Sequence, residues 1–234
     1  MKRILLSWSS GKDSAWSLHI LRQRGEYEVA GLLTTFNEVA GRVAMHAVRR
    51  ELVEQQAAAA GLPLWAVPLP WPCSNEQYES LMAQTCAKAV SEGIAGVAFG
   101  DLFLEDVRAY REKQMAGTGL RPIFPVWGLP THALAEEMIA AGLRAKLTCV
   151  DTTKLEQSFV GREFDRTLLS ALPAGVDPRV HRRDPLQRAA RGVPFLCIRR
   201  AYAEWRAPGF SRRDRGSREL CFCRSDFQLR CFVL

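Results

Sequence analysis

Short apolar runs alternate with longer segments of helical composition along the first 150 residues. The apolar runs predict strands at Arg3–Trp8, Glu28–Thr35, Leu64–Leu69, Gly96–Phe99, Leu120–Phe124 and Ala145–Val150. The segments between them predict helices at Ser14–Arg24, His46–Ala60, Asn75–Glu92, Leu104–Ala116 and Thr131–Ala141. A glycine follows each helix, where a left-handed residue commonly ends one: Gly25, Gly61, Gly93, Gly117 and Gly142. This pattern predicts an α/β fold with a doubly wound, mostly parallel sheet, whose ligands bind beyond the carboxyl ends of the strands.

The pattern changes after the last predicted strand. Residues 151–178 are mixed in character and end in the loop-like segment Leu172–Pro178. Residues 179–234 are rich in arginine, and residues 179–218 lack a clear helical or strand period. We therefore expect a main domain over residues 1–150, the start of a C-terminal substrate region over 151–178, and an atypical tail over 179–234.

The net charge of +7 is unevenly distributed. Residues 178–234 contain 14 Arg, no Lys and 5 acidic residues, which leaves 18 basic and 20 acidic residues in the remainder of the chain. The basic character therefore belongs to the tail, and it gives no reason to expect nucleic acid as a partner of the main domain.

Cysteine usage and hydropathy bear on the cellular compartment. The seven cysteines are odd in number and form no Cys-x-x-Cys pair, which favours reduced thiols over a disulfide framework or a zinc site. The apolar runs are far shorter than the roughly 20 residues of a membrane helix, and no secretion signal opens the sequence. We expect a cytoplasmic protein without a membrane partner.

Chemistry is expected first at the sequence Ser9-Ser10-Gly11-Lys12-Asp13-Ser14, between the first predicted strand and the first predicted helix. A strand that runs through a tight turn into a helix directs free backbone N–H groups and the positive helix end at one point, where an anion can bind. Gly11 permits close approach, Lys12 adds a positive charge, and the serine hydroxyls can donate hydrogen bonds. Asp13 is expected either to cap the helix or to hold Mg²⁺.

This loop resembles the SGGKDS loop of the ATP pyrophosphatases, which cradles the β and γ phosphates of ATP. Ser10 stands where that pattern has its first glycine, and the Gly-x-x-x-x-Gly-Lys-Ser/Thr pattern of common ATPases is absent. Over about residues 2–178 the chain is similar to the diphthine:ammonia ligase-like family of ATP pyrophosphatases. The similar segments are Gly31–Glu38, Met45–Arg50, Leu69–Asn75, Gly100–Arg108 and Leu147–Asp151.

The resemblance implies a Rossmann-like adenine nucleotide α-hydrolase fold and conversion of ATP to AMP and pyrophosphate. In characterised family members, this reaction drives amidation of diphthine on translation elongation factor two with ammonia. We therefore expect an ATP-dependent, amide-forming ligase that uses ATP, Mg²⁺ and ammonia and acts on the carboxylate of an unidentified protein or small molecule. The alternatives are a nucleotide-binding module without turnover and ATP-dependent modification of RNA bases.

The expected site residues fall into three groups. The catalytic candidates are Lys12, Asp13 and Asp101. The nucleotide-binding candidates are Ser9, Ser10, Gly11, Lys12, Asp13, Ser14, Thr34, Thr35, Asn37 and Gly100. The substrate candidates are His46, Glu105 and Arg108.

Several of these candidates have an alternative, purely structural role. Thr34 and Thr35 can simply finish a strand, acidic residues near Asp101 can favour a helix dipole, and His46 can cap a helix or pack.

The tail departs from the family pattern. After Pro178 the family continues into an acidic, glycine-containing motif of the type EGGEFHTF, which this sequence lacks. Arginine and cysteine without lysine are typical of GC-rich coding sequence translated in the wrong frame. One hypothesis is a frameshift near codon 178, which would make the C-terminal region truncated or aberrant; the other is a divergent basic tail.

Overall fold

The computed structural model describes residues 1–44, 48–129, 131–148, 150, 155–173 and 230–233. These belong to one compact unit, whereas the second unit, Val180–Ser225, lies outside the described residues. The strands are β1 (Lys2–Ser7), β2 (Tyr27–Asn37), β3 (Arg42–Val43), β4 (Leu64–Leu69), β5 (Gly96–Ala98), β6 (Arg121–Ile123), β7 (Arg144–Leu147) and β8 (Arg230–Val233). The helices are α1 (Lys12–Arg24), α2 (Arg50–Ala60), α3 (Asn75–Ser91), α4 (Glu105–Met115), α5 (Thr131–Ala140), the 3-10 turn η1 (Gln157–Phe159) and α6 (Arg166–Ala171).

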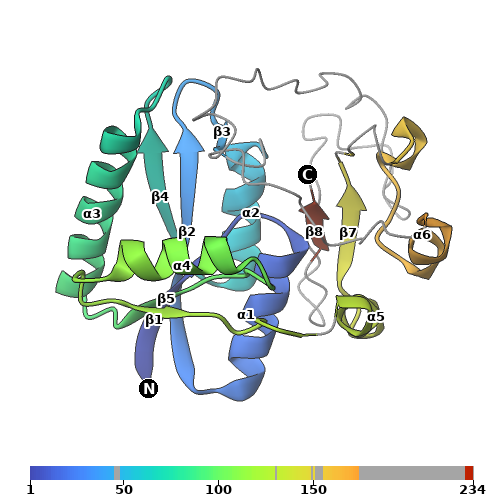
Figure 1. Ribbon diagram of the computed structural model, residues 1–234, viewed down its shortest axis with the longest axis horizontal. Coiled ribbons are helices and arrows are strands. Elements are labelled where there is room, and N and C mark those ends of the chain that lie inside the picture. The colour runs from blue at the N-terminus through green and yellow to red at the C-terminus, as the bar shows by residue number, and fades with distance from the viewer. Residues whose placement is uncertain (45–47, 130, 149, 151–154, 174–229, 234) are drawn as a thin grey trace, which may run out of the picture. The chain divides into compact units, whose positions relative to one another are not determined.

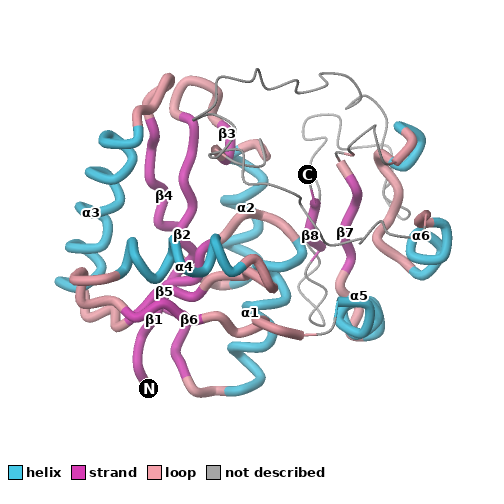
Figure 2. Tube along the Cα trace, viewed as in Figure 1, coloured by secondary structure: helices cyan, strands magenta, loops and turns pink. Residues whose placement is uncertain are grey.

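The main sheet has six strands, with β4 and β3 both pairing with β2, followed by β1, β5 and β6 (Figures 1 and 2). All of its strand pairs are parallel except that of β2 with the short β3. Strand order therefore runs outward from β1 in both directions, which confirms the predicted doubly wound, mostly parallel sheet.

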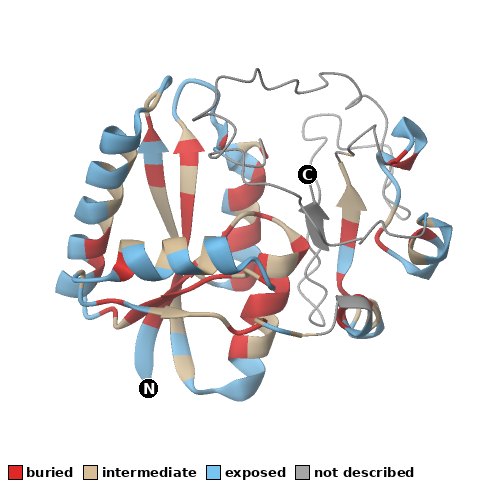
Figure 3. Cartoon of the chain, in the orientation of Figure 1, coloured by how far each residue is buried: buried red, intermediate tan, exposed pale blue. Residues whose placement is uncertain are grey.

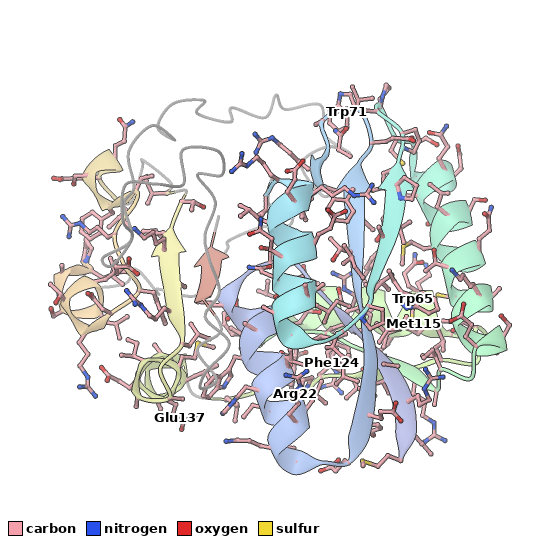
Figure 4. All side chains as sticks on the ribbon, turned by 180° about the vertical axis from the view of Figure 1, so that it is seen from behind. Arg22, Trp65, Trp71, Met115, Phe124 and Glu137 are labelled. Atoms are coloured by element: carbon pink, nitrogen blue, oxygen red, sulfur yellow. The ribbon has the colours of Figure 1, made fainter. Side chains whose placement is uncertain are left out.

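Helices cover both faces of this sheet, as the burial of its central strand requires. Ile4, Leu5 and Leu6 of β1 are each 0% exposed. Figure 3 shows buried residues along the strands of the sheet and on the helices that cover it. On one face, Leu5 and Val97 pack in a core with Cys86 of α3 and Met115 of α4. Helix α2 lies on the opposite face from α4, as the views from front and back agree (Figures 1 and 4).

The ends of the first two helices follow from their glycines. Gly25 and Gly61 end α1 and α2 with φ of 62° and 66°, a left-handed conformation that is costly for residues with a Cβ atom. These two predicted helix ends are therefore confirmed.

The start of α2 differs from the prediction of a helix from His46. Residues 45–47 lie outside the described residues, and α2 begins at Arg50. Before it, Arg42 and Val43 form β3, and the backbone N–H of Val43 donates a hydrogen bond to the carbonyl of Val48 at 2.8 Å. Arg49 has extended backbone and forms an antiparallel bridge with Arg42, so the helix starts later than its apolar pattern suggests.

The last predicted strand was placed in the wrong sheet. Residues Ala145–Val150 were expected to extend the main sheet, but β7 (Arg144–Leu147) pairs in parallel with β8 (Arg230–Val233) in a separate two-stranded sheet. An apolar run predicts that a strand forms but does not identify its partner, and this partner lies in the tail.

Candidate nucleotide-binding site

The site is built where the doubly wound sheet reverses direction. Strands β1 and β5 are neighbours, but the chain moves from β1 outward to β2 and from β5 outward to β6 on the other side. Right-handed crossovers then send the loops after β1 and β5 to opposite faces, and ligands of doubly wound sheets bind at such a point. The loop after β1 contains Ser9–Gly11, and the loop after β5 begins with Phe99 and Gly100.

These two loops are in close contact. A Cβ atom added at Gly100 would lie 3.1 Å from both the carbonyl carbon and the oxygen of Asp13, and 3.2 Å from the backbone nitrogen of Ser14. Gly100 therefore allows the β5 loop to approach the first turn of α1. The structure brings this predicted site residue together with the loop Ser9–Ser14.

Helix α1 begins without a side chain on its N-cap residue. That residue is Gly11, which has extended backbone. The Ser14 hydroxyl donates to the carbonyl of Gly11 at 2.8 Å, and the Gly11 N–H donates to Ser9 Oγ at 3.4 Å. The backbone N–H groups at the start of α1, beginning with Lys12, are those that a phosphate would accept from.

Ser10 adopts a backbone conformation that favours glycine. Its φ is 66°, and it is the one described residue other than glycine with a positive φ. It is fully buried. A Cβ atom in the left-handed region costs roughly 1–2 kcal/mol, so this loop retains the shape associated with glycine while containing serine.

Lys12 and Asp13 form an ion pair with each other. Lys12 Nζ lies 3.1 Å and 2.9 Å from the two Asp13 carboxylate oxygens. The Lys12 side chain is only 2% exposed and that of Asp13 23%. Asp13 therefore does not cap the helix, which removes one of the two roles expected for it and leaves the other, as a ligand of Mg²⁺, a prediction.

Asp101 is held by an arginine that sequence analysis did not single out. Asp101 Oδ2 lies 3.6 Å from Nε of Arg111 in α4, and both side chains are about a quarter exposed. The Arg111 guanidinium also lies 5.0 Å from the ring centre of Phe99 at the end of β5. Asp101 is thus a carboxylate beside Gly100 with a positive charge close to it.

The two substrate candidates on α4 differ from each other. Glu105 is exposed in the first turn of the helix. The Arg108 guanidinium lies 4.9 Å from the ring centres of both Phe124 and Trp127, and its Nε donates to Glu112 at 2.8 Å. These contacts give Arg108 a packing role on α4.

The three β2 candidates each make a hydrogen bond near the carboxyl end of the strand. The Thr34 hydroxyl is buried and donates to the carbonyl of Trp8 at 2.8 Å, so it supports the end of β1. The carbonyl of Thr35 accepts from the N–H of Ala44 at 3.0 Å. Asn37 ends β2, and its Oδ1 accepts from the N–H of Ala40 at 2.9 Å. The side chains of Thr34 and Asn37 therefore have structural roles, and Thr35 has one through its backbone carbonyl. The third substrate candidate, His46, lies outside the described residues.

A cavity of about 280 Å³ lies at the carboxyl ends of β2 and β4. Its lining residues are Phe36, Asn37, Glu38, Gly41, Arg50, Ala66 and Pro68. The guanidinium of Arg50 lies 5.5 Å from the centre of the Phe36 ring and is paired with Glu54 at 2.8 Å. Trp71, 69% exposed, follows β4 at the same edge of the sheet (Figure 4). The alternation of apolar residues in β2 gave no signal for this cavity.

The described residues bring no three His, Cys, Asp or Glu side chains together as a metal site. Mg²⁺ in nucleotide sites is held by one or two carboxylates together with substrate phosphates and water, so Asp13 in the loop fits such a role.

Of the described cysteines, Cys73 and Cys86 have free thiols, and burial raises the pKa of Cys86. In the same part of the chain, no helix combines the length and apolar composition that a membrane crossing requires.

The chain is a PP-loop protein of the ATP pyrophosphatase class, with a doubly wound sheet and the loop Ser9–Ser14 between β1 and α1. Residues 1–122 match the model of the diphthamide synthase N-terminal domain, and the chain belongs to that family. Its members are generally ATP pyrophosphatases that bind ATP and Mg²⁺. The family resemblance seen in the sequence is confirmed.

More distant comparisons add little. A predicted subunit of tRNA methyltransferase from Methanocaldococcus jannaschii aligns with 62% of this chain and 80% of its own, at 16% identity and a TM-score of 0.41. A likeness this weak supports no argument about function. No curated protein matches the chain.

Proposed function

We propose that the chain binds ATP at the loop Ser9–Ser14 and uses it to adenylate a carboxylate, which ammonia then converts to an amide. The main observation in favour is the start of α1, where the N-cap residue is Gly11, without a side chain, and the buried Lys12 follows directly. Membership of the diphthamide synthase N-terminal domain family supports the choice of ATP as the anion.

The reaction divides into two steps. An acceptor carboxylate oxygen attacks the α phosphorus of ATP, and the bond from this phosphorus to the bridging oxygen breaks with release of pyrophosphate. Ammonia then attacks the acyl carbon, loses a proton, and AMP leaves with the electron pair of the broken acyl–oxygen bond.

The chain's own groups assist the first step by electrostatic stabilisation. The backbone N–H groups at the start of α1 and the ammonium of Lys12 would hold the charge of the departing pyrophosphate. Asp13 would hold Mg²⁺, which supplies positive charge to neutralise the phosphates.

The test is product analysis with ATP, Mg²⁺, ammonium and a panel of carboxylic acids. We expect AMP and pyrophosphate in equal amounts, dependent on one acceptor and lost in Lys12→Met. Glu137→Gln, which changes an exposed residue of α5, serves as a control and should retain activity. Formation of ADP and phosphate in place of AMP and pyrophosphate would rule out the proposed chemistry.

A nucleotide-binding module without turnover is the second candidate. It is favoured by the pairing of Asp101 with Arg111, which engages a carboxylate expected to serve catalysis. This candidate predicts that ATP binds with normal dependence on Lys12 but that no acceptor elicits pyrophosphate release.

A further inference from the structure

The side chain of Gln56 in α2 lies between the end of β1 and the loop Ser9–Ser14. Its Oε1 accepts a hydrogen bond from Nε1 of Trp8 at 2.9 Å, and its Nε2 donates to the carbonyl of Ser10 at 3.5 Å. Gln56 is buried, and within the described chain its amide has these two partners. A side chain of α2 is therefore bonded to the backbone of the loop that is proposed to bind phosphate.

The two partners of Gln56 require both halves of an amide. The indole N–H of Trp8 can only donate, and the carbonyl of Ser10 can only accept, so the side chain between them must present one acceptor and one donor. Glutamine does this, and its partners determine which way the amide is turned. An ionised glutamate has no proton to donate, and a methionine has neither a strong donor nor a strong acceptor.

The bond to the Ser10 carbonyl determines the direction of the next N–H group. This peptide is trans, and in a planar trans peptide the C=O and N–H groups point in opposite directions. With the Ser10 carbonyl held by Gln56, the N–H of Gly11 points to the other side, where its nitrogen lies 3.4 Å from Ser9 Oγ. Ser14 Oγ lies 3.3 Å from the same oxygen. The polar groups expected to bind phosphate are thus gathered on the side of the loop away from Gln56.

Rotation of the Ser10–Gly11 peptide would remove this arrangement. It would put the Ser10 carbonyl oxygen, with its partial negative charge, where the Gly11 N–H now points, and an anion would be repelled. Ser10 has a φ of 66°, in the left-handed region that disfavours a residue with a Cβ atom, so serine does not favour the observed backbone by itself. The hydrogen bond from Gln56 stabilises it.

On the basis of the phosphate site proposed above, we propose that Gln56 is a positioning residue of that site: its amide N–H holds the Ser10–Gly11 peptide in the orientation that presents the Gly11 N–H to the phosphates. Gln56 acts through the loop backbone and makes no contact with the nucleotide. When its donor is lost, a smaller fraction of the molecules has the loop ready to bind, and the apparent affinity falls with that fraction.

The first test separates the two hydrogen bonds of Gln56, with inorganic pyrophosphate and Mg²⁺ as the probe in calorimetry. Gln56→Met removes the donor to Ser10, and we expect its affinity to be about fivefold lower than that of the wild type. Trp8→Phe removes the other hydrogen bond and leaves the bond to Ser10, so its affinity should stay within about twofold of the wild type although the protein loses stability.

The second test restores the donor by protonation in Gln56→Glu. The ionised carboxylate cannot donate to the Ser10 carbonyl, whereas the protonated carboxyl group can donate to it and still accept from Trp8. Burial raises the pKa of a carboxyl group, so mild acid protonates it. Between about pH 8 and pH 5.5, the affinity of this variant relative to the wild type should recover at least about threefold.

The controls for the second test are measured at the same pH values. Comparison with the wild type at each pH cancels the titration of pyrophosphate and of the loop's own Asp13. The relative affinities of Gln56→Met and of Gln84→Glu, which makes the same change at an exposed position of α3, should not vary with pH. A role of Gln56 in stability alone would not produce a pH-dependent affinity in folded protein.

Circular dichroism establishes that each variant is folded at every pH, and Gln56→Leu is a second substitution without a donor if Gln56→Met does not fold. The positioning role is overturned, while the proposed function stands, if the donor-free variant binds pyrophosphate like the wild type or loses no more affinity than Trp8→Phe. A folded Gln56→Glu whose relative affinity does not change with pH overturns it as well. If the wild type binds no pyrophosphate, the phosphate site itself is wrong and both proposals fail.

Discussion

The indole N–H of Trp8 donates a 2.9 Å hydrogen bond to Oε1 of Gln56, which joins the end of β1 to helix α2. The Gln56 amide Nε2 in turn donates to the carbonyl of Ser10 at 3.5 Å. Gln56 is 2% exposed, so water does not replace these bonds when they are lost. One buried side chain thus fixes the phosphate loop against the helix beside it.

Gln56→Leu should lower the free energy of unfolding by about 2 kcal/mol, because it leaves the Trp8 N–H and the Ser10 carbonyl buried without these partners. Urea unfolding measures the change. Gln84→Leu, at an exposed position of α3, is the matched control and should change stability by less than about 0.5 kcal/mol. Equal effects of the two substitutions would contradict the role given to Gln56.

Ser10→Gly should stabilise the protein by about 0.5–1 kcal/mol. It relieves the positive φ of 66°, although the greater freedom of glycine in the unfolded chain offsets part of the gain. Ser10→Ala retains the Cβ atom and should show no such gain. Thermal or urea unfolding measures the stability of both variants. If Ser10→Ala stabilises the protein as much as Ser10→Gly, the positive φ of Ser10 is not a source of strain.

Gly100→Ala should lower both stability and nucleotide affinity. Its Cβ would lie 3.1 Å from backbone atoms of Asp13, and backbone cannot move as a side chain can. We expect a loss of about 1–3 kcal/mol in unfolding free energy. Gly11→Ala is the comparison for stability, since its Cβ would meet only the hydroxyl oxygen of Ser9 at 3.3 Å. A smaller loss at Gly100 than at Gly11 would show that the two loops are not in contact.

Lys12→Met should weaken ATP binding in the presence of Mg²⁺ more than tenfold, because hydrogen bonds to charged groups contribute about 1.5–3 kcal/mol. Methionine retains an apolar stem of similar length. Lys113→Met removes an exposed lysine of α4 and controls for the change in net charge. Calorimetry that finds the affinity of Lys12→Met unchanged would exclude this loop as the phosphate site.

Asp101→Asn and Arg111→Met should each lower the free energy of unfolding by about 1–2 kcal/mol, because each leaves a partly buried charge without its partner. The double variant should lose less than the sum of the two, with a coupling of about 1 kcal/mol. Strictly additive losses would show that the 3.6 Å pair contributes no interaction energy. The same variants, assayed for pyrophosphate release, determine whether Asp101 also serves the reaction.

The main sheet was predictable from sequence because each of its parallel strands is an apolar run followed by a helix. The position of β7 was not, since its partner, β8, lies in a tail without a periodic pattern. The short β3 was also missed. This strand consists of only two residues, Arg42 and Val43. It forms because they pair with the end of β2, and a segment this short carries no sequence pattern of its own.

In the site, the loop Ser9–Ser14 and Gly100 were predictable because they follow parallel strands, whose carboxyl ends lie at the same edge of a doubly wound sheet. Gln56 and Arg111 were not, because a glutamine in an alanine-rich helix and an arginine among charged residues are typical of solvent-exposed faces. Only the packing of α2 and α4 against the sheet turns these side chains toward the loops. The domain boundaries after residue 150 stay a prediction. The frameshift hypothesis also stays a prediction, and sequencing across codons 170–190 tests it.

Strand β2 pairs with β1, β3 and β4, and all four strands are complete by Leu69, within the first third of the chain. A nascent chain that has just passed this point on the ribosome already contains the phosphate loop and the buried glutamine that fixes it. The loop that contacts the phosphate loop, at Gly100, is synthesised later. Leu5 of β1 packs in one core with Val97 of β5 and Met115 of α4, so the core beneath the loop is complete only after these later elements have been made. The apolar residues of β1, which are synthesised first, therefore gain their last buried partners late in the synthesis of the domain.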